Sequence, residues 1–201
     1  MNKEDIAFMI LVSSSGVSPA IQMDYATQAN LKRKGFNDKD ISNALYLRSA
    51  INNYYRGKTN QKETQKIIDS YRGEKWVSES SLPLRQNMML PDHPKLAKWY
   101  LEMDFNPEEY FSNVNVPVAL FYGSYDIWVP IDRSIKIWES VLKKCNNNSY
   151  KIFRIKNSGH LMIVDEDNNP KENTISHEYT ELLKNWVKTN VNLGNRKSLT
   201  D

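Results

Sequence analysis

Residues 116–131 read V-P-V-A-L-F-Y-G-S-Y-D-I-W-V-P-I, and this stretch decides the class of fold. Within it, residues 118–122 are almost wholly apolar and are bounded by Pro117 and Gly123. A strand that is buried on both faces has this composition, because neither face has a water-facing position for polar groups. Asp126 follows on the loop at the carboxyl end of the strand, where ligands and chemistry lie in open α/β sheets.

A second candidate strand, residues 150–155, precedes a polar turn that carries His160. An acid and a histidine therefore follow two strands, in that order along the chain. A carboxylate can hold a histidine in one tautomer, which lets the imidazole act as a general base. Asp126 and His160 are the catalytic residues that the sequence predicts.

The segments G-S-Y-D-I-W-V-P at residues 123–130 and N-S-G-H at residues 157–160 resemble the acid and histidine segments of the α/β-hydrolase superfamily. Within it, the sequence is most similar to the serine-aminopeptidase-like and dipeptidyl-peptidase-like esterase branch. The resemblance covers about residues 6–187 but only the second half of such a hydrolase. It implies a partial α/β-hydrolase fold, with a short parallel sheet, flanking helices and a large helical lid. It also implies hydrolysis of a carboxylic ester, amide or peptide bond, with charge stabilisation by Asp126 and proton transfer by His160.

The nucleophile of that family lies on a G-x-S-x-G turn ahead of the acid and the histidine. No two of the seven glycines in this sequence are four positions apart, so the turn and its oxyanion hole are missing from these residues. We therefore expect the C-terminal part of a serine hydrolase, inactive as this chain alone. The alternative is a non-catalytic module that binds a small molecule or a partner protein. A third possibility is an unconventional nucleophile at Ser13, Ser14 or Ser15, although serines before Gly16 are typical of a turn.

The apolar run at residues 6–12 predicts a further strand, so residues 6–12, 118–122 and 150–155 are expected to pair in parallel. In the family, the strand that matches residues 6–12 pairs with a strand that is absent here. Its outer edge would expose unpaired backbone groups beside apolar side chains, which favours pairing with another chain. A buried strand so near Met1 fits a chain that has lost its upstream half. We expect the missing N-terminal half, or another chain, to bind along this edge.

Residues 21–111 have a mostly helical pattern, with expected helix starts at Asn37 and Asn60 and helix ends at Gly57 and Gly73. This is far more chain than a crossover between parallel strands requires, and the resemblance implies a lid. Lids exclude water and shape substrate pockets. Candidates for lining such a pocket are Trp76, Trp99, Tyr54 and Tyr55. The expected divisions are a first strand and turn at 1–20, the lid at 21–111, a core at 112–189 and a disordered tail at 190–201.

Charge and composition exclude several classes of function. The 27 basic and 24 acidic residues are spread along the chain, which does not favour a nucleic-acid interface. Three scattered histidines without ligand spacing predict neither a metal nor a cofactor, and we expect His93 at a helix start and His177 at the surface. The acidic residues 165–167 lack the calcium-loop glycine and are interpreted as a solvated loop.

The run at residues 6–12 is too short to span a bilayer. Glu4 and Asp5 precede it, where an export signal carries basic residues. We therefore expect no membrane span and a cytoplasmic location. The single cysteine, Cys145, excludes an internal disulfide.

Overall fold

A computed structural model describes residues 6–166 and 169–197, and the described chain forms two compact units. The first, here called the sheet unit, consists of the chain up to Val17 and from Pro107 onward. The second, the helical unit, is Ser18–Asn106. The assignment of residues 21–111 as a lid stays a prediction.

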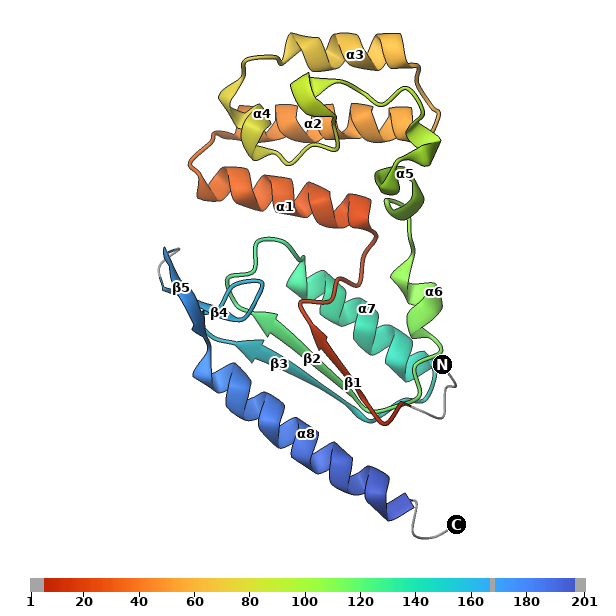
Figure 1. Ribbon diagram of the computed structural model, residues 1–201, viewed down its shortest axis with the longest axis vertical. Helices are drawn as coiled ribbons and strands as arrows, with labels where there is room; N and C mark the ends of the chain where they lie inside the picture. Colours follow the sequence, from red (N-terminus) through yellow and green to blue (C-terminus); the bar gives the residue numbers. More distant parts are fainter. Residues whose placement is uncertain (1–5, 167–168, 198–201) are drawn as a thin grey trace. The chain divides into compact units, whose positions relative to one another are not determined.

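The sheet unit contains three parallel strands in the order β1-β2-β3 (Figure 1). Their bounds are Met9–Val12 for β1, Val118–Gly123 for β2 and Tyr150–Ile155 for β3. All six residues of the central strand β2 are buried, so the prediction of a strand covered on both faces is confirmed. The chain is α/β, with a short parallel sheet flanked by helices, as predicted.

The first strand is shorter than the predicted residues 6–12. Its pairing begins where the Met9 amide donates to the Pro117 carbonyl at 2.8 Å. Pro117 has no N–H, so it cannot extend the ladder toward the start of the chain. Residues 6–8 have the composition of a strand, but they do not pair because Pro117 offers no backbone N–H as a donor.

Helices cover the two faces of the sheet through alternate residues of β2. Leu120 and Tyr122 pack in one apolar cluster with Trp138 of α7, while Phe121 packs in another with Trp186 of α8. The helices of this unit are α6 at Pro107–Phe111, α7 at Ile131–Lys144 and α8 at His177–Lys197. Phe111 stacks on Trp138, with ring centroids 3.5 Å apart.

One prediction about the C-terminal region is wrong. Asp165 is buried rather than part of a solvated loop, because an antiparallel hairpin forms from β4, Ile163–Glu166, and β5, Asn169–Ile175. The Asp165 amide donates to the Asn157 carbonyl at 2.8 Å, which ties the hairpin to the loop after β3. Asp167 lies outside the described residues. Helix α8 is described as far as Lys197, whereas residues 198–201 lie outside the described residues, and the disordered tail at 190–201 stays a prediction.

The helical unit is built around α2. The helices after Asn37 and Asn60 begin as predicted, since the side chains of these asparagines accept the amides of Asp40 and Glu63 at 3.0 and 2.9 Å. These bonds satisfy amides that have no partner within the helix. The helices are α1 Pro19–Arg33, α2 Asp38–Tyr55, α3 Gln61–Ser70, α4 Lys75–Glu79 and α5 Lys98–Glu102, with single 3-10 turns η2 Gln86–Met88 and η3 Pro94–Leu96.

A buried arginine connects three parts of the helical unit. Arg48 on α2 is 1% exposed, and its Nε donates to Thr27 Oγ1 of α1 at 3.0 Å. Its Nη2 donates to the carbonyls of Ser80 and Ser81, which follow α4. Burial lowers the pKa of Arg48 to about 10, and the charge of Asp24 opposes that shift.

Arg48→Met is expected to lower the free energy of unfolding by about 2–4 kcal/mol, because it removes the hydrogen bonds of a buried guanidinium to Thr27 and to the carbonyls of Ser80 and Ser81. Urea unfolding followed by circular dichroism measures the loss. The matched control is Arg72→Met, which removes an exposed pair with Asp69 and should cost no more than about 0.5 kcal/mol. Equal losses in the two variants would contradict the structural role of Arg48.

Candidate functional site

The acid loop starts where β2 ends. The backbone turns sharply after Gly123, and the Asp126 amide donates to the Gly123 carbonyl at 3.1 Å. The amides of Ser124 and Tyr125 donate to the carbonyls of Ile155 and Ser158, both at 2.9 Å. These bonds join the acid loop to the end of β3 and to the loop after it, so the two predicted site loops form one continuous hydrogen-bonded structure.

The Asp126 carboxylate is buried and held at both oxygens. Its Oδ1 accepts the amides of Trp128 at 2.7 Å and Val129 at 3.2 Å, while Oδ2 lies 2.9 Å from His160 Nδ1. Its side chain has no exposed surface, whereas 35% of the His160 side chain is exposed. A carboxylate fixed by two amides cannot turn away from the imidazole, and as an acceptor it favours the tautomer with the proton on Nδ1.

Gly123 permits this arrangement because no side chain would fit there. A Cβ at this position would lie 2.3 Å from the carbonyl oxygens of both Ser158 and Gly159. The histidine loop therefore passes directly over the end of β2. The absence of a side chain at Gly123 sets how closely Asp126 and His160 can approach.

The structure brings the predicted residues Asp126 and His160 together, but the three candidate serines differ from one another. Ser13 is 8% exposed, and its hydroxyl donates to the His160 backbone carbonyl at 2.6 Å rather than to the imidazole. Ser15 makes only a local bond, to the Val17 carbonyl at 3.2 Å. The Ser13 bond was not foreseen, since its partner is 147 positions away and no local pattern marks it.

The other predicted site features take different places. His93 stands at the start of η3 and His177 at the start of α8, both exposed. Within residues 6–166 and 169–197, no three metal-binding side chains gather into a group. No helix in that part of the chain is long and apolar enough to cross a bilayer.

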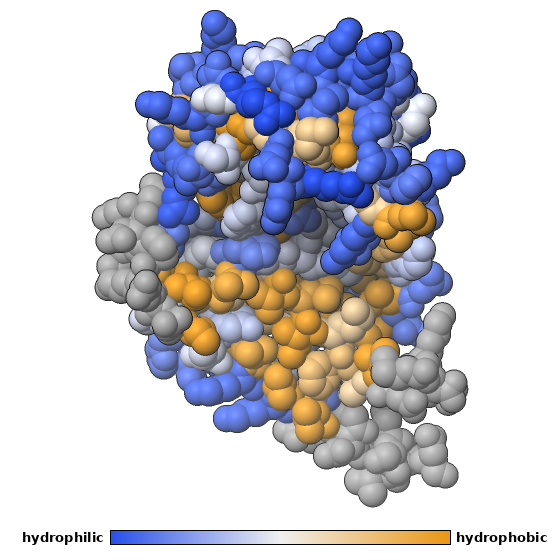
Figure 2. Space-filling view, turned by 45° about the horizontal axis from the view of Figure 1, so that its top comes forward, coloured by the Kyte–Doolittle hydropathy of each residue, from blue (hydrophilic) through white to orange (hydrophobic). Residues whose placement is uncertain are grey.

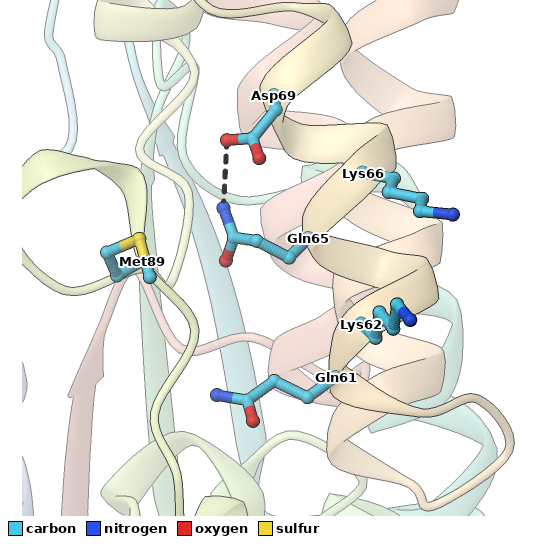
Figure 3. Close-up of a pocket in the computed structure, with 6 residues that line it drawn as sticks. All are labelled: Gln61, Lys62, Gln65, Lys66, Asp69 and Met89. Atoms are coloured by element: carbon cyan, nitrogen blue, oxygen red, sulfur yellow. Dashed lines mark hydrogen bonds between the residues drawn. The ribbon is translucent and has the colours of Figure 1, made fainter.

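The hollows in the described part of the helical unit include two of about 440 Å³ each. Of the four aromatic candidates, Tyr55 and Trp99 line one hollow, whereas Trp76 and Tyr54 are buried in the core. The other hollow lies beside α3, where Gln61 and Gln65 extend toward Met89 and Gln65 donates to Asp69 at 3.1 Å (Figure 3).

Tyr122 adds a pH-dependent contribution to the stability of the site. Its side chain is buried and its hydroxyl donates to the Ser14 carbonyl at 2.8 Å. Burial, reinforced by the charge of Asp126, raises the pKa of Tyr122. The folded state therefore keeps the phenol neutral, and this stability is fully present below the unfolded-state pKa of about 10 and is lost as the pH rises above it.

Replacing Tyr122 with phenylalanine should flatten this dependence. Between about pH 8 and pH 11, the free energy of unfolding of the wild-type protein should fall by about 1 kcal/mol more than that of Tyr122→Phe. Urea titrations at each pH give both values. A variant that keeps the whole alkaline loss would show that other tyrosines cause it.

Comparison with known proteins leaves this chain without a family assignment. No protein-family model matches the sequence, and no curated protein matches it. Among solved structures, the crystal structure of VinJ is similar at a TM-score of 0.43 and 11% identity, over 91% of this chain and 57% of that one. The structure of MenH from S. aureus is similar at 0.37 and 14% identity, over 92% of this chain and 60% of that one. The chain thus spans about three fifths of the length of these structures.

Proposed function

We propose that this chain is part of an α/β-hydrolase-fold serine hydrolase and supplies the acid and the base of its catalytic triad. The observation that carries the proposal is the contact of 2.9 Å between His160 Nδ1 and Asp126 Oδ2, at the carboxyl ends of two adjacent parallel strands. The substrate would be a small molecule with a carboxylic ester, amide or peptide bond.

In this proposal, Asp126 keeps the proton of His160 on Nδ1, so that Nε2 carries a lone pair. Nε2 takes the proton of a serine hydroxyl while the serine oxygen bonds to the substrate carbonyl carbon. The imidazolium, stabilised by Asp126, then gives this proton to the leaving alcohol or amine as its bond to carbon breaks. Water repeats the two transfers and releases the acid.

The nucleophilic serine would come from outside residues 1–201, on the same polypeptide or on another chain. Among the described strands, β1 pairs only with β2, which leaves the other edge of β1 open to a further parallel strand. Val12 at the end of β1 is 40% exposed, and Figure 2 shows apolar side chains gathered over the sheet unit. An apolar surface beside unpaired backbone groups suits the addition of a strand. The helical unit would serve as the lid of the complete enzyme.

The test is fluorophosphonate labelling of the natively expressed polypeptide. The polypeptide is captured through an affinity tag, together with any partner that binds it. Mass spectrometry should find one labelled serine, located outside residues 1–201. His160→Gln should slow labelling by about 10³-fold or more, whereas the control His93→Gln should leave it unchanged. A labelled serine within residues 1–201, or labelling that does not depend on His160, would refute the proposal.

The missing G-x-S-x-G turn favours a second candidate, a non-catalytic module that binds a small molecule or a partner protein. The same experiment separates the two. A folded, captured polypeptide that reacts with no fluorophosphonate would support the binding module and exclude the hydrolase.

A further inference from the structure

The turn after β1 contacts the histidine loop through Ser13. The Ser13 amide continues the sheet by donating to the Phe121 carbonyl at 2.8 Å. Its backbone is in the left-handed region, with φ of 49°, and its hydroxyl donates to the His160 carbonyl at 2.6 Å. A serine pays a steric cost in this conformation, and residues in such conformations persist where the surrounding structure holds them.

The histidine loop has a residue in the left-handed backbone region on each side of His160. Asn157 has a φ of 49° and Met162 has a φ of 58°. The loop is held by bonds from neighbouring residues, among them Gly159 to the Ile163 carbonyl at 2.9 Å and Met162 to the Gly159 carbonyl at 3.1 Å. Among the described residues, Ser13 is the donor found for the carbonyl of His160 itself.

The turn that carries Ser13 is anchored a second time. The Tyr122 hydroxyl donates to the carbonyl of Ser14 at 2.8 Å, and Tyr122 belongs to the strand that precedes Asp126. The turn after β1 therefore bonds to the acid strand through Ser14 and to the histidine loop through Ser13. The bond from Ser13 restrains the backbone of His160, while the contact with Asp126 restrains its imidazole ring.

We propose that Ser13 is a positioning residue that holds the backbone of His160 so that its imidazole stays against Asp126. The importance of this position for catalysis rests on the proposed function, but the position itself does not. Ser13 acts through its hydroxyl and the His160 carbonyl and does not touch the reacting atoms. The serine weighed above as a nucleophile thus has a different role.

The test measures the Hδ1 proton of His160 by NMR, since this proton lies in the contact with Asp126. The variants are Ser13→Ala, which removes the hydroxyl, and Ser13→Gly, which removes the hydroxyl and also relieves the backbone strain. Exchange of Hδ1 with water should become about fivefold to tenfold faster in both variants, as expected from the loss of one hydrogen bond. If only the backbone conformation of residue 13 mattered, Hδ1 of His160 would exchange no faster in Ser13→Gly than in the wild-type protein, which would contradict a role for the hydroxyl.

Two controls separate positioning from general loss of stability. Ser14→Ala removes a neighbouring hydroxyl but keeps the carbonyl that Tyr122 uses, so Hδ1 exchange should not change. Val141→Ala weakens the buried face of α7 without touching either loop. Equal acceleration by Val141→Ala and Ser13→Ala, or no acceleration by Ser13→Ala, would overturn the proposal. Failure of the fluorophosphonate test would leave this result unaffected, so the two proposals fail separately.

Discussion

Gly123→Ala is expected to lower the free energy of unfolding of the sheet unit by about 3 kcal/mol or more, a large effect for the addition of one methyl group. The new Cβ would lie 2.3 Å from the carbonyl oxygens of Ser158 and Gly159. These are backbone atoms, so no side chain can rotate away to make room. The histidine loop would have to move off the end of β2, which separates His160 from Asp126.

Gly159→Ala is the matched control, because it adds the same methyl group to the facing loop. The nearest atom to a Cβ at Gly159 is an Asp165 carboxylate oxygen at 3.8 Å, an ordinary contact distance. This variant should unfold within about 0.5 kcal/mol of the wild-type protein. Urea unfolding followed by tryptophan fluorescence gives both values. Similar stabilities for the two variants would mean that the loops do not approach as closely as the structure shows.

If the chain acts as the proposed serine hydrolase, Asp126→Asn is expected to leave the fold nearly unchanged and to slow fluorophosphonate labelling by about 10³–10⁴-fold. The asparagine oxygen can still accept the amides of Trp128 and Val129, so the acid loop keeps its shape. Its amide group would face His160 as a donor, however, and would favour the tautomer with the proton on Nε2. In that tautomer Nε2 has no lone pair to accept the serine proton.

The labelling rate, followed over time in the captured polypeptide, measures the effect of Asp126→Asn. Asp132→Asn is the control, since Asp132 is an exposed acid that pairs with Arg154 and not with His160. It should label at the wild-type rate. A labelling rate in Asp126→Asn close to that of Asp132→Asn would remove Asp126 from the mechanism.

The sequence predicted those parts of the fold that local pattern determines. The apolar run of β2 identified a strand covered on both faces, because burial on two sides excludes polar residues from every position. The asparagine caps of α2 and α3 could also be predicted from the sequence, since a cap depends on residues three positions apart. The placing of Asp126 and His160 on loops after adjacent strands followed from their order along the chain and from the family resemblance.

Features that depend on distant contacts could not be predicted in the same way. The bond from Ser13 to His160 and the close pass of the histidine loop over Gly123 depend on where the strands lie in the sheet. The burial of Asp165 depends on the β4–β5 hairpin, whose polar sequence resembles that of a solvated loop. In each case, the determining partner is a backbone group, which any residue type supplies and no sequence pattern marks.

Asp126 is proposed to hold His160 as a base whose Nε2 lone pair is available. Nitrogen-15 NMR of the histidine side chains reports which ring nitrogen of neutral His160 carries the proton. We expect the proton on Nδ1 and a bare Nε2, and a change of this signal in Asp126→Asn. A proton on Nε2 of neutral His160, unaffected by Asp126→Asn, would show that Asp126 does not hold His160 as a base.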